Sequence, residues 1–296
     1  MGEEGLTFLS LEMAPRCNAR CLYCFSAHEL GLRPRDALSL AEYKRVIHEA
    51  VALGLRTVVY PGVGEPLLDA KTLSLIEFCA GLGIATVVYT CGVIDEKVLP
   101  RLRACGTSMI IKMDSLCPQH YERLVGLPFG PFANSLSLIL AAYRGSSEHV
   151  GSFHITRLAA NTVVTRVNKN DITPVAQLCR KNGIIHFVET LSRAGAAADH
   201  WDKLVGKEYA ELREIAESYG HWVSSATIDG RCGLYAHGIT IDVNGDLLAC
   251  PTARWIRLGN ICDHSIAELI AIRNDAFPNI AEHYCAAREL TVGPEA

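Results

Sequence analysis

Residues 13–26, "MAPRCNARCLYCFS", place three cysteines on one short segment near the start of the chain. Cys17, Cys21 and Cys24 lie within eight residues and are spaced C-x3-C-x2-C. The apolar segment 7–13, which predicts a β-strand, ends where the cysteine segment begins. The three thiols are therefore expected on a loop directly after a strand, with no fourth cysteine beside them.

Four explanations of this spacing compete. Three ordinary buried or free thiols on one short loop would be a coincidence, and a redox pair of Cys21 and Cys24 is expected at the start of a helix. A structural zinc site needs four ligands, so its fourth ligand would have to come from a distant segment. An iron–sulfur cluster held by thiolates on three of its irons fits best, because the fourth iron stays open to bind a ligand.

Composition narrows the class of protein. The 296 residues are 49% hydrophobic, which is enough for one large domain or for one large and one small domain. The net charge of -4 gives no electrostatic case for binding nucleic acid. The chain shows no membrane-spanning apolar run and no signal-peptide pattern, so we expect a cytoplasmic protein without a membrane partner. Twelve cysteines then indicate metal ligands and buried thiols rather than disulfides.

Outward from the cysteine segment, strand-like and helix-like segments alternate. Six β-then-α units with continuous apolar strands predict a parallel sheet covered by helices, either as an open sheet or as a barrel. In both architectures ligands bind at the carboxyl ends of the strands, where Cys17 is expected. The expected strands are 7–13, 56–60, 85–90, 108–113, 161–167 and 184–189, and the expected helices are 40–53, about 70–82, from 95 toward Gly106, 133–145 and 172–182.

The pattern changes after residue 190. Small residues at 195–199 predict a boundary, so we expect one domain over 1–200 and a second over 201–296. Alternating apolar and polar residues around Asn244-Gly245 predict a β-hairpin at 238–250. Helices are expected at 207–219 and 265–272. The predicted fold class is therefore α/β, with a small C-terminal α+β domain.

The C-x3-C-x2-C motif with an aromatic residue, Tyr23, before its last cysteine resembles the motif of radical S-adenosylmethionine (SAM) enzymes. The resemblance implies a [4Fe-4S] cluster on Cys17, Cys21 and Cys24, whose open iron binds the methionine moiety of SAM. One electron, expected from a flavodoxin- or ferredoxin-type reductant, then cleaves SAM to a 5′-deoxyadenosyl radical that abstracts a hydrogen atom. The resemblance also implies a partial (β/α)6 barrel and a contact between Tyr23 and adenine.

Further segments extend the resemblance over about residues 7–195. "YPGVGEPLL" (60–68) looks like the segment that binds the methionine amino group in this family. "YTCG" (89–92) carries Cys91 where the family often has asparagine. Segments 112–126, 162–168 and 187–195 resemble the ends of the fourth, fifth and sixth strands. The resemblance implies cofactor contacts from Gly64, Glu65, Lys112, Asp114 and Arg166, and substrate contacts from Glu189 and Arg193.

Four cysteines follow residue 200. Cys232 and Cys250, with the predicted hairpin between them, resemble the start of the SPASM and twitch extensions of this family, which hold auxiliary [4Fe-4S] clusters. A full SPASM domain needs seven cysteines, so four allow one auxiliary cluster and favour the twitch type. A zinc site is the alternative. Arg288 stands where the family has a second cysteine after Cys285, so ligation by four cysteines would need Cys262.

The nature of the substrate is a separate question. Only sixteen residues precede Cys17, so we expect a small molecule rather than a leader-bearing peptide. The final "TVGPEA" lacks the paired glycines of molybdopterin-precursor enzymes. Length, the early motif and an Arg/Ala-rich composition most resemble aminoglycoside epimerases of the neomycin type. This resemblance predicts hydrogen abstraction from a ring carbon of an aminoglycoside and hydrogen return by Cys250, with Cys232, Cys262 and Cys285 as ligands of the auxiliary cluster.

Two other functions stay open. A twitch-type dehydrogenase would oxidise a carbinol of an aminocyclitol and pass an electron to the auxiliary cluster, with Cys250 as a cluster ligand. An iron–sulfur electron-transfer or sensor protein would need no SAM pocket, and segment 60–68 argues against it. Carboxylates that are expected near the site would suit a polycationic substrate, namely those of Glu12, Glu65, Asp114, Glu189 and Asp242.

Overall fold

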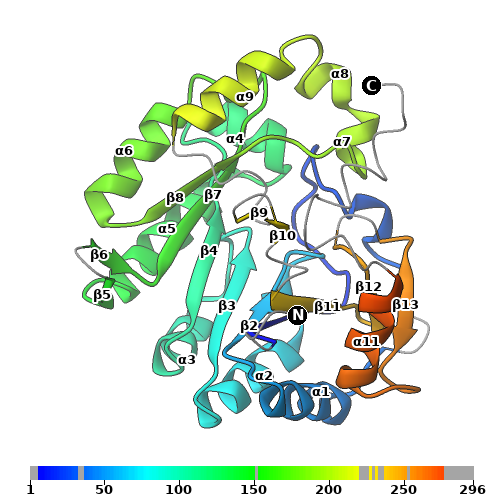
Figure 1. Ribbon diagram of the computed structural model, residues 1–296. Helices are drawn as coiled ribbons and strands as arrows, with labels where there is room; N and C mark the ends of the chain where they lie inside the picture. Colours follow the sequence, from blue (N-terminus) through cyan, green and yellow to red (C-terminus); the bar gives the residue numbers. More distant parts are fainter. Residues whose placement is uncertain are drawn as a thin grey trace. The chain divides into compact units, whose positions relative to one another are not determined.

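The computed structural model describes residues 6–32, 37–150, 153–219, 227–228, 231–232, 237–251 and 254–276 (Figure 1). The chain forms two compact units, each built from separate stretches of sequence. The first unit comprises Met1–Pro15, Gly31–Thr86 and Ser225–Ala296, and the second comprises Arg16–Leu30 and Val87–Ser224. The cysteine segment therefore belongs to the second unit. The expected division into domains 1–200 and 201–296 stays a prediction.

In the first unit, three parallel strands continue into an antiparallel ladder. β1 (Phe8–Leu11) lies between β2 (Thr57–Tyr60) and β11 (Gly238–Ile241) and pairs with both in parallel. β12 (Asp246–Leu248) and β13 (Arg257–Asn260) extend from β11 as antiparallel neighbours. The unit also contains α1 (Leu40–Ala52), η2 (Pro66–Leu68), α2 (Ala70–Gly81), the hairpin of β9 (Thr227–Ile228) and β10 (Arg231–Cys232), and α11 (Ile266–Ala276).

The second unit is built on parallel strands in the order β3 (Ala85–Thr90), β4 (Ser108–Lys112), β7 (Leu158–Val163) and β8 (Ile185–Glu189). A separate antiparallel hairpin joins β5 (Ser147–Val150) and β6 (Phe153–Thr156). The helices are η1 (Ala27–Glu29), η3 (Glu96–Val98), α3 (Leu99–Ala104), α4 (Pro118–Val125), α5 (Phe129–Ala142), α6 (Ile172–Asn182), α7 (Ala196–Asp199), α8 (Trp201–Leu204) and α9 (Tyr209–Ser218).

Local signals in the sequence begin and end several elements where they were predicted. Ser39 Oγ accepts a hydrogen bond from the backbone N–H of Glu42, and the Glu42 carboxylate accepts one from Ser39 N–H, which completes a capping box. The Asp95 carboxylate caps η3, and Gly183 ends α6 with a φ of 66°. The hairpin around Asn244-Gly245 is also confirmed.

The strand expected at 161–167 ends four residues early, at Val163. The side chain of Asn168 explains this difference, because it turns the chain after the strand. Asn168 Oδ1 accepts hydrogen bonds from the backbone N–H and the hydroxyl of Thr165, and Asn168 Nδ2 donates to the carbonyl of Val163. An asparagine side chain that competes for backbone groups in this way favours a turn over a strand.

Other elements were not predicted or begin elsewhere. α5 begins at Phe129, four residues before the expected start, while α4 and the β5–β6 hairpin were not expected at all. The predicted C-terminal hairpin does not stand apart within its unit, because β11 pairs with β1.

The mixed α/β class with mainly parallel pairing is confirmed and is consistent with a radical SAM barrel. A separate twitch domain stays a prediction. Within the described ranges no single helix is long and apolar enough to cross a membrane, and α4 with α5 meets that test only as a pair bent by 99°.

Candidate functional site

The three cysteines of the first motif lie on one loop, residues 16–30, which we call the cysteine loop. Cys17, Cys21 and Cys24 are all half-buried, and none is in a disulfide. The backbone N–H of Cys24 donates to the carbonyl of Cys21 at 3.1 Å. This tight turn keeps the last two thiols on neighbouring parts of the loop.

Helix α4 fastens one side of the cysteine loop. The N–H of Arg20 donates to the carbonyl of Val125 at 2.9 Å, and the N–H of Leu22 donates to the carbonyl of Leu124 at 2.9 Å. Gly126 ends α4 with a φ of 70°, and a Cβ at this position would lie 3.0 Å from the carbonyl oxygen of Arg20. A glycine that ends the helix therefore also allows the close approach of the loop.

The segment after β8 fastens the loop near its last cysteine. The N–H of Ala196 donates to the carbonyl of Cys24 at 2.9 Å. Gly195 has a φ of 54°, and a Cβ added to it would lie 2.4 Å from the carbonyl oxygen of Phe25 and 2.5 Å from that of Cys24. Only glycine fits between these two backbones without a shift of the loop.

The end of β3 contacts the loop between its first two cysteines. Asn18 Nδ2 donates to the carbonyl of Val93 at 3.3 Å, and the thiol of Cys91 donates to Asn18 Oδ1 at 3.4 Å. Cys91, which replaces the asparagine usual in the family segment, therefore still makes a polar contact at this strand end.

Tyr23, Lys112 and Asp114 form one polar cluster. The Tyr23 hydroxyl donates to Asp114 Oδ2, and Lys112 Nζ lies 3.2 Å from Asp114 Oδ1 and 4.8 Å from the centre of the Tyr23 ring. Asp114 Oδ1 also accepts a hydrogen bond from the N–H of Val163 at 2.9 Å, and Lys112 donates to Asn161 Oδ1 at 2.8 Å. Both carboxylate oxygens of the fully buried Asp114 therefore already have protein donors.

Burial and the nearby carboxylate disfavour ionisation of the groups on the loop. Burial, and then the charge of Asp114, raises the pKa of the Cys21 thiol to about 12 and raises the pKa of Tyr23 well above its usual value. At neutral pH Cys21 is therefore a thiol in the metal-free chain, and a metal that binds there must displace its proton.

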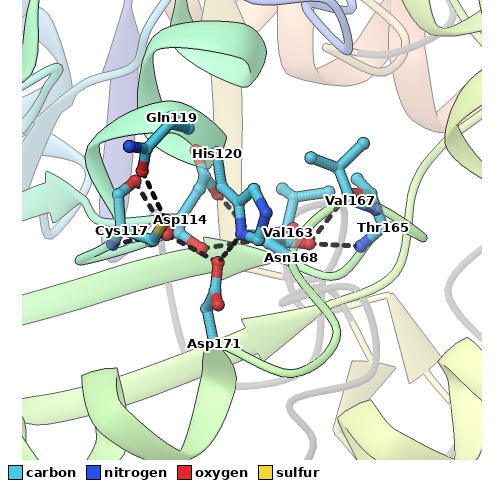
Figure 2. A network of polar contacts seen from close by, with 10 residues as sticks. Asp114, Cys117, Gln119, His120, Val163, Thr165, Val167, Asn168 and Asp171 are labelled. Carbon is cyan, nitrogen blue, oxygen red and sulfur yellow. Dashed lines mark hydrogen bonds and ion pairs between the residues drawn. The ribbon is translucent and has the colours of Figure 1, made fainter.

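A wider network supports this cluster from the ends of β4 and β7 (Figure 2). Asn168 Nδ2 donates to the main-chain carbonyl of Asp114 at 2.8 Å. In Figure 2, Asp171 points toward His120, whose Nδ1 lies 2.7 Å from Asp171 Oδ2, and the hydroxyl of Ser115 donates to the same oxygen at 2.6 Å. The network ties α4, which fastens the cysteine loop, to the start of α6.

The donor set fits an iron–sulfur cluster by its chemistry. Three thiols on one fastened loop are soft ligands of the kind that such clusters require. Within the described ranges, no three His, Cys, Asp or Glu side chains already converge as a metal site. Cys17, Cys21 and Cys24 would hold such a cluster.

Gly64 and Glu65 belong to the first unit, on the loop after β2. Gly64 has a φ of 83°, and the buried carboxylate of Glu65 accepts a hydrogen bond from the N–H of Leu67 at the start of η2. Their contacts to SAM stay a prediction.

Most of the acids expected to suit a polycation have protein partners instead. Glu12 forms a bidentate ion pair with Arg254, and the carboxylate of Asp242 accepts hydrogen bonds from the N–H groups of Asn244 and Asp246. Glu65 and Asp114 also have the protein partners described above. Four of the five carboxylates that were expected to suit a polycationic substrate are therefore already hydrogen-bonded or ion-paired within the protein.

The remaining residues that were predicted to contact the cofactor or the substrate interact with protein groups nearby. Arg166 pairs with Glu208 at 2.7 Å and donates to the carbonyl of Asp202, so its guanidinium lies against the segment between α8 and α9. Arg193 is exposed and stacks over the ring of Trp201 at 5.5 Å. Glu189 is half-buried near Tyr89, whose pKa it helps to raise after burial. Cofactor or substrate contacts from these three residues stay predictions.

The C-terminal cysteines are not gathered in the part of the chain that the structure describes. Cys250 is half-buried just after β12, and Cys262 is exposed just after β13. The side chain of Cys232, on β10, and the whole of Cys285 lie outside the described residues. The auxiliary cluster therefore stays a prediction.

Sequence reasoning missed Asn161, Asn168 and Gly195 as residues that support the site. Asn161 and Asn168 frame the end of β7, and buried asparagines beside an apolar strand are a usable signal. Gly195 was read only as part of a flexible boundary, although its positive φ serves a close backbone contact.

Comparison with known proteins agrees with the cysteine motif. A family model described as the Radical SAM superfamily matches residues 11–156. The mitochondrial GTP 3′,8-cyclase of Arabidopsis thaliana is 27% identical over 272 residues, which cover 86% of this chain and 66% of that protein. The GTP 3′,8-cyclase of Pseudomonas syringae is 36% identical over 121 residues, which cover 40% of this chain and 36% of that protein.

Solved structures share the fold at low identity. Streptococcus suis SuiB bound to S-adenosylmethionine superposes with a TM-score of 0.65 at 16% identity, over 90% of this chain and 65% of that one. BtrN in complex with AdoMet and 2-DOIA gives a TM-score of 0.50 at 14% identity, over 94% and 87% of the two chains. The matches to the two cyclases span two thirds or less of those relatives' lengths.

Proposed function

We propose that this chain cleaves SAM reductively and directs the resulting radical at a small molecule, because a family model described as the Radical SAM superfamily matches residues 11–156. The observation that carries the proposal is the cysteine loop, whose three half-buried thiols are presented by backbone bonds to α4 and to the start of α7. A [4Fe-4S] cluster held by Cys17, Cys21 and Cys24 would supply the electron that converts SAM into methionine and a 5′-deoxyadenosyl radical.

The chain's own residues bind and orient SAM in this proposal. Tyr23 offers its ring to adenine, and Gly64 and Glu65 lie on the loop that receives the methionine amino group. A flavodoxin- or ferredoxin-type protein would deliver the electron.

For the reaction itself, we propose epimerisation of an aminoglycoside ring carbon, with Cys250 as hydrogen donor. The thiol of Cys250 would give a hydrogen atom to the carbon radical. An electron from the reductant and a proton would then convert the resulting thiyl radical back to the thiol. The Arg254–Glu12 ion pair supports this role, because it fastens the chain just after Cys250 to the carboxyl end of β1. Ligands of parallel α/β folds bind at that end of the strands.

A second candidate is cyclisation of a purine nucleotide, favoured by the similarity to GTP 3′,8-cyclases over 272 residues. The paired state of Glu12, Asp114 and Asp242 also removes much of the charge argument for a polycation. A third outcome, oxidation of an aminocyclitol carbinol with an auxiliary cluster as electron acceptor, follows from the sequence resemblance alone.

Anaerobic turnover in D2O separates these reactions. The reconstituted protein is mixed with SAM and a strong reductant, and then with neomycin-class aminoglycosides in one series and GTP in another. One deuterium gained at an inverted carbon supports the epimerase, and loss of two hydrogens supports the dehydrogenase. A cyclised nucleotide supports the second candidate. Absence of 5′-deoxyadenosine in every series would refute the radical proposal itself.

A further inference from the structure

We propose that Asp114 is a positioning residue, whose carboxylate latches the cysteine loop to the ends of β4 and β7 through the hydroxyl of Tyr23. We call the bond between Tyr23 and Asp114 the latch. Its proposed role rests on the proposed function, because it assumes that the cysteine loop carries the ligands of the iron–sulfur cluster. It assigns to the hydroxyl of Tyr23 a role separate from any contact that its ring makes with a cofactor.

The carboxylate of Asp114 is already engaged by protein donors on both of its oxygens. Oδ2 accepts from the Tyr23 hydroxyl, while Oδ1 accepts from Val163 N–H at 2.9 Å and lies 3.2 Å from Lys112 Nζ. Asp114 has no exposed surface. A direct contact from this carboxylate to SAM would require the side chains that cover it to move.

The main chain of Asp114 is fixed as firmly as its side chain. Asn168 Nδ2 bridges the carbonyls of Asp114 and Val163, at 2.8 Å and 3.0 Å, and Asn168 is fully buried with its Oδ1 also satisfied. The ends of β4 and β7 therefore hold Asp114 in place, and the Tyr23 hydroxyl bonds to this fixed carboxylate.

Lys112 provides a cation beside the buried carboxylate of Asp114. Its ammonium group pairs with Asp114, donates to Asn161 Oδ1 at 2.8 Å and faces the Tyr23 ring at 4.8 Å. Hydrogen bonds to a carboxylate acceptor are about twice as strong as bonds between neutral groups. A phenylalanine at position 23 would keep the ring but lose this bond.

The test compares Tyr23→Phe with Tyr121→Phe in the full chain, before and after cluster reconstitution. Tyr121 is a matched control, because its buried hydroxyl has no hydrogen-bond partner among the residues that the structure describes. Amide exchange is followed at Arg20 and Leu22, whose N–H groups bond to α4. Loss of a charge-assisted hydrogen bond should speed local opening roughly 10- to 100-fold in Tyr23→Phe, and release of iron to a chelator about tenfold. Tyr121→Phe should leave both rates unchanged.

Asp114→Asn and the double variant complete the test. Because Tyr23 and Asp114 act through one bond, the double variant should exchange no faster than the faster of the two single variants. Additive effects, wild-type exchange in Tyr23→Phe, or equal effects in Tyr121→Phe would overturn the latch. Loss of SAM binding in Asp114→Asn with wild-type loop exchange would also overturn it and assign Asp114 to the cofactor. Exchange needs no turnover, so failure of the latch and failure of the proposed function are distinguishable.

Discussion

The two sets of cysteines in this chain differ in how they are held. Cys17, Cys21 and Cys24 share one loop that four other segments hold through backbone or side-chain hydrogen bonds. Cys250 and Cys262 lie after different strands of the first unit, and Cys262 is exposed. The short chain between them keeps the first three cysteines on one segment. The described cysteines of the second set are carried by separate segments.

The difference teaches where spacing in a sequence carries chemical information. Ligands within eight residues are constrained by the short chain between them, so their spacing alone indicates the metal centre. Ligands from distant turns depend on tertiary contacts that their spacing does not encode. Substitutions in the two regions should therefore have unequal effects.

The largest expected effect follows loss of a ligand from the first set. Cys21→Ala should abolish the SAM-binding cluster and reduce formation of 5′-deoxyadenosine at least about 1,000-fold, because the cluster would lose one of its three thiolate ligands. The matched variant Cys262→Ala should keep that cluster. Iron and sulfide per chain, together with 5′-deoxyadenosine yield, check both. Equal losses in the two variants would break the comparison between the regions.

The Cys250→Ala variant tests whether Cys250, from the second set of cysteines, donates hydrogen in the reaction or binds a metal. If Cys250 donates hydrogen, iron per chain and formation of 5′-deoxyadenosine should persist while inverted product falls at least about 100-fold. Mass spectrometry of products in D2O, with metal analysis, measures both quantities. A drop in iron with loss of one cluster signal would instead identify Cys250 as a ligand.

Gly195→Ala should disturb the first region without removing a ligand. The added Cβ would lie 2.4 Å from the carbonyl of Phe25, at a positive φ, so the loop must shift at a cost of about 1–3 kcal/mol. We expect roughly a 5- to 100-fold loss in SAM cleavage. Gly81→Ala is the control, because a Cβ at that helical position meets no atom within 4 Å. Unchanged cleavage in Gly195→Ala would mean that the loop needs no support from this side.

The smallest expected effect lies away from both sets of cysteines. Burial lowers the pKa of His186 from 6.5 to about 4, and its buried Nδ1 finds no hydrogen-bond partner within the described part of the chain. Because the folded-state pKa is the lower one, the stabilising term is present above pH 6.5 and is lost as the pH falls toward 4. Since His186 is partly exposed, we expect about 1–2 kcal/mol less stability at pH 4 than at pH 7.

Urea unfolding of the wild type and of His186→Gln at the two pH values measures this term. The substituted chain should lose about 1–2 kcal/mol less than the wild type over the same range. Iron content at pH 7 should be equal in both. An identical pH dependence in the two proteins would contradict the assignment to His186.

The sequence predicted the parts of the molecule that local signals control. The start of α1 at Leu40, the end of α6 at Asn182 and the Asn244-Gly245 hairpin depend on local signals, and all three agree with the expected ranges. The end of β7 was misplaced because the turn depends on a side chain five residues farther along, Asn168.

In the candidate site, too, local features could be predicted from the sequence and contacts between distant segments could not. The cysteine spacing indicated the loop, and the family match to residues 11–156 agrees with it. The partners of Asp114 and Arg166 were not predictable, because both are satisfied by residues from distant segments. The substrate stays a proposal for the same reason, since substrate recognition depends on side chains that spacing does not bring together.

The measurement that tests the central claim most directly is reductive cleavage of SAM by the reconstituted protein under anaerobic conditions. The account predicts 5′-deoxyadenosine and methionine in equal amounts from the wild type with a strong reductant, and neither product from a variant in which Cys17, Cys21 and Cys24 are all alanine. A wild-type protein that binds a full cluster but forms no 5′-deoxyadenosine would contradict the account and favour an electron-transfer or sensor role.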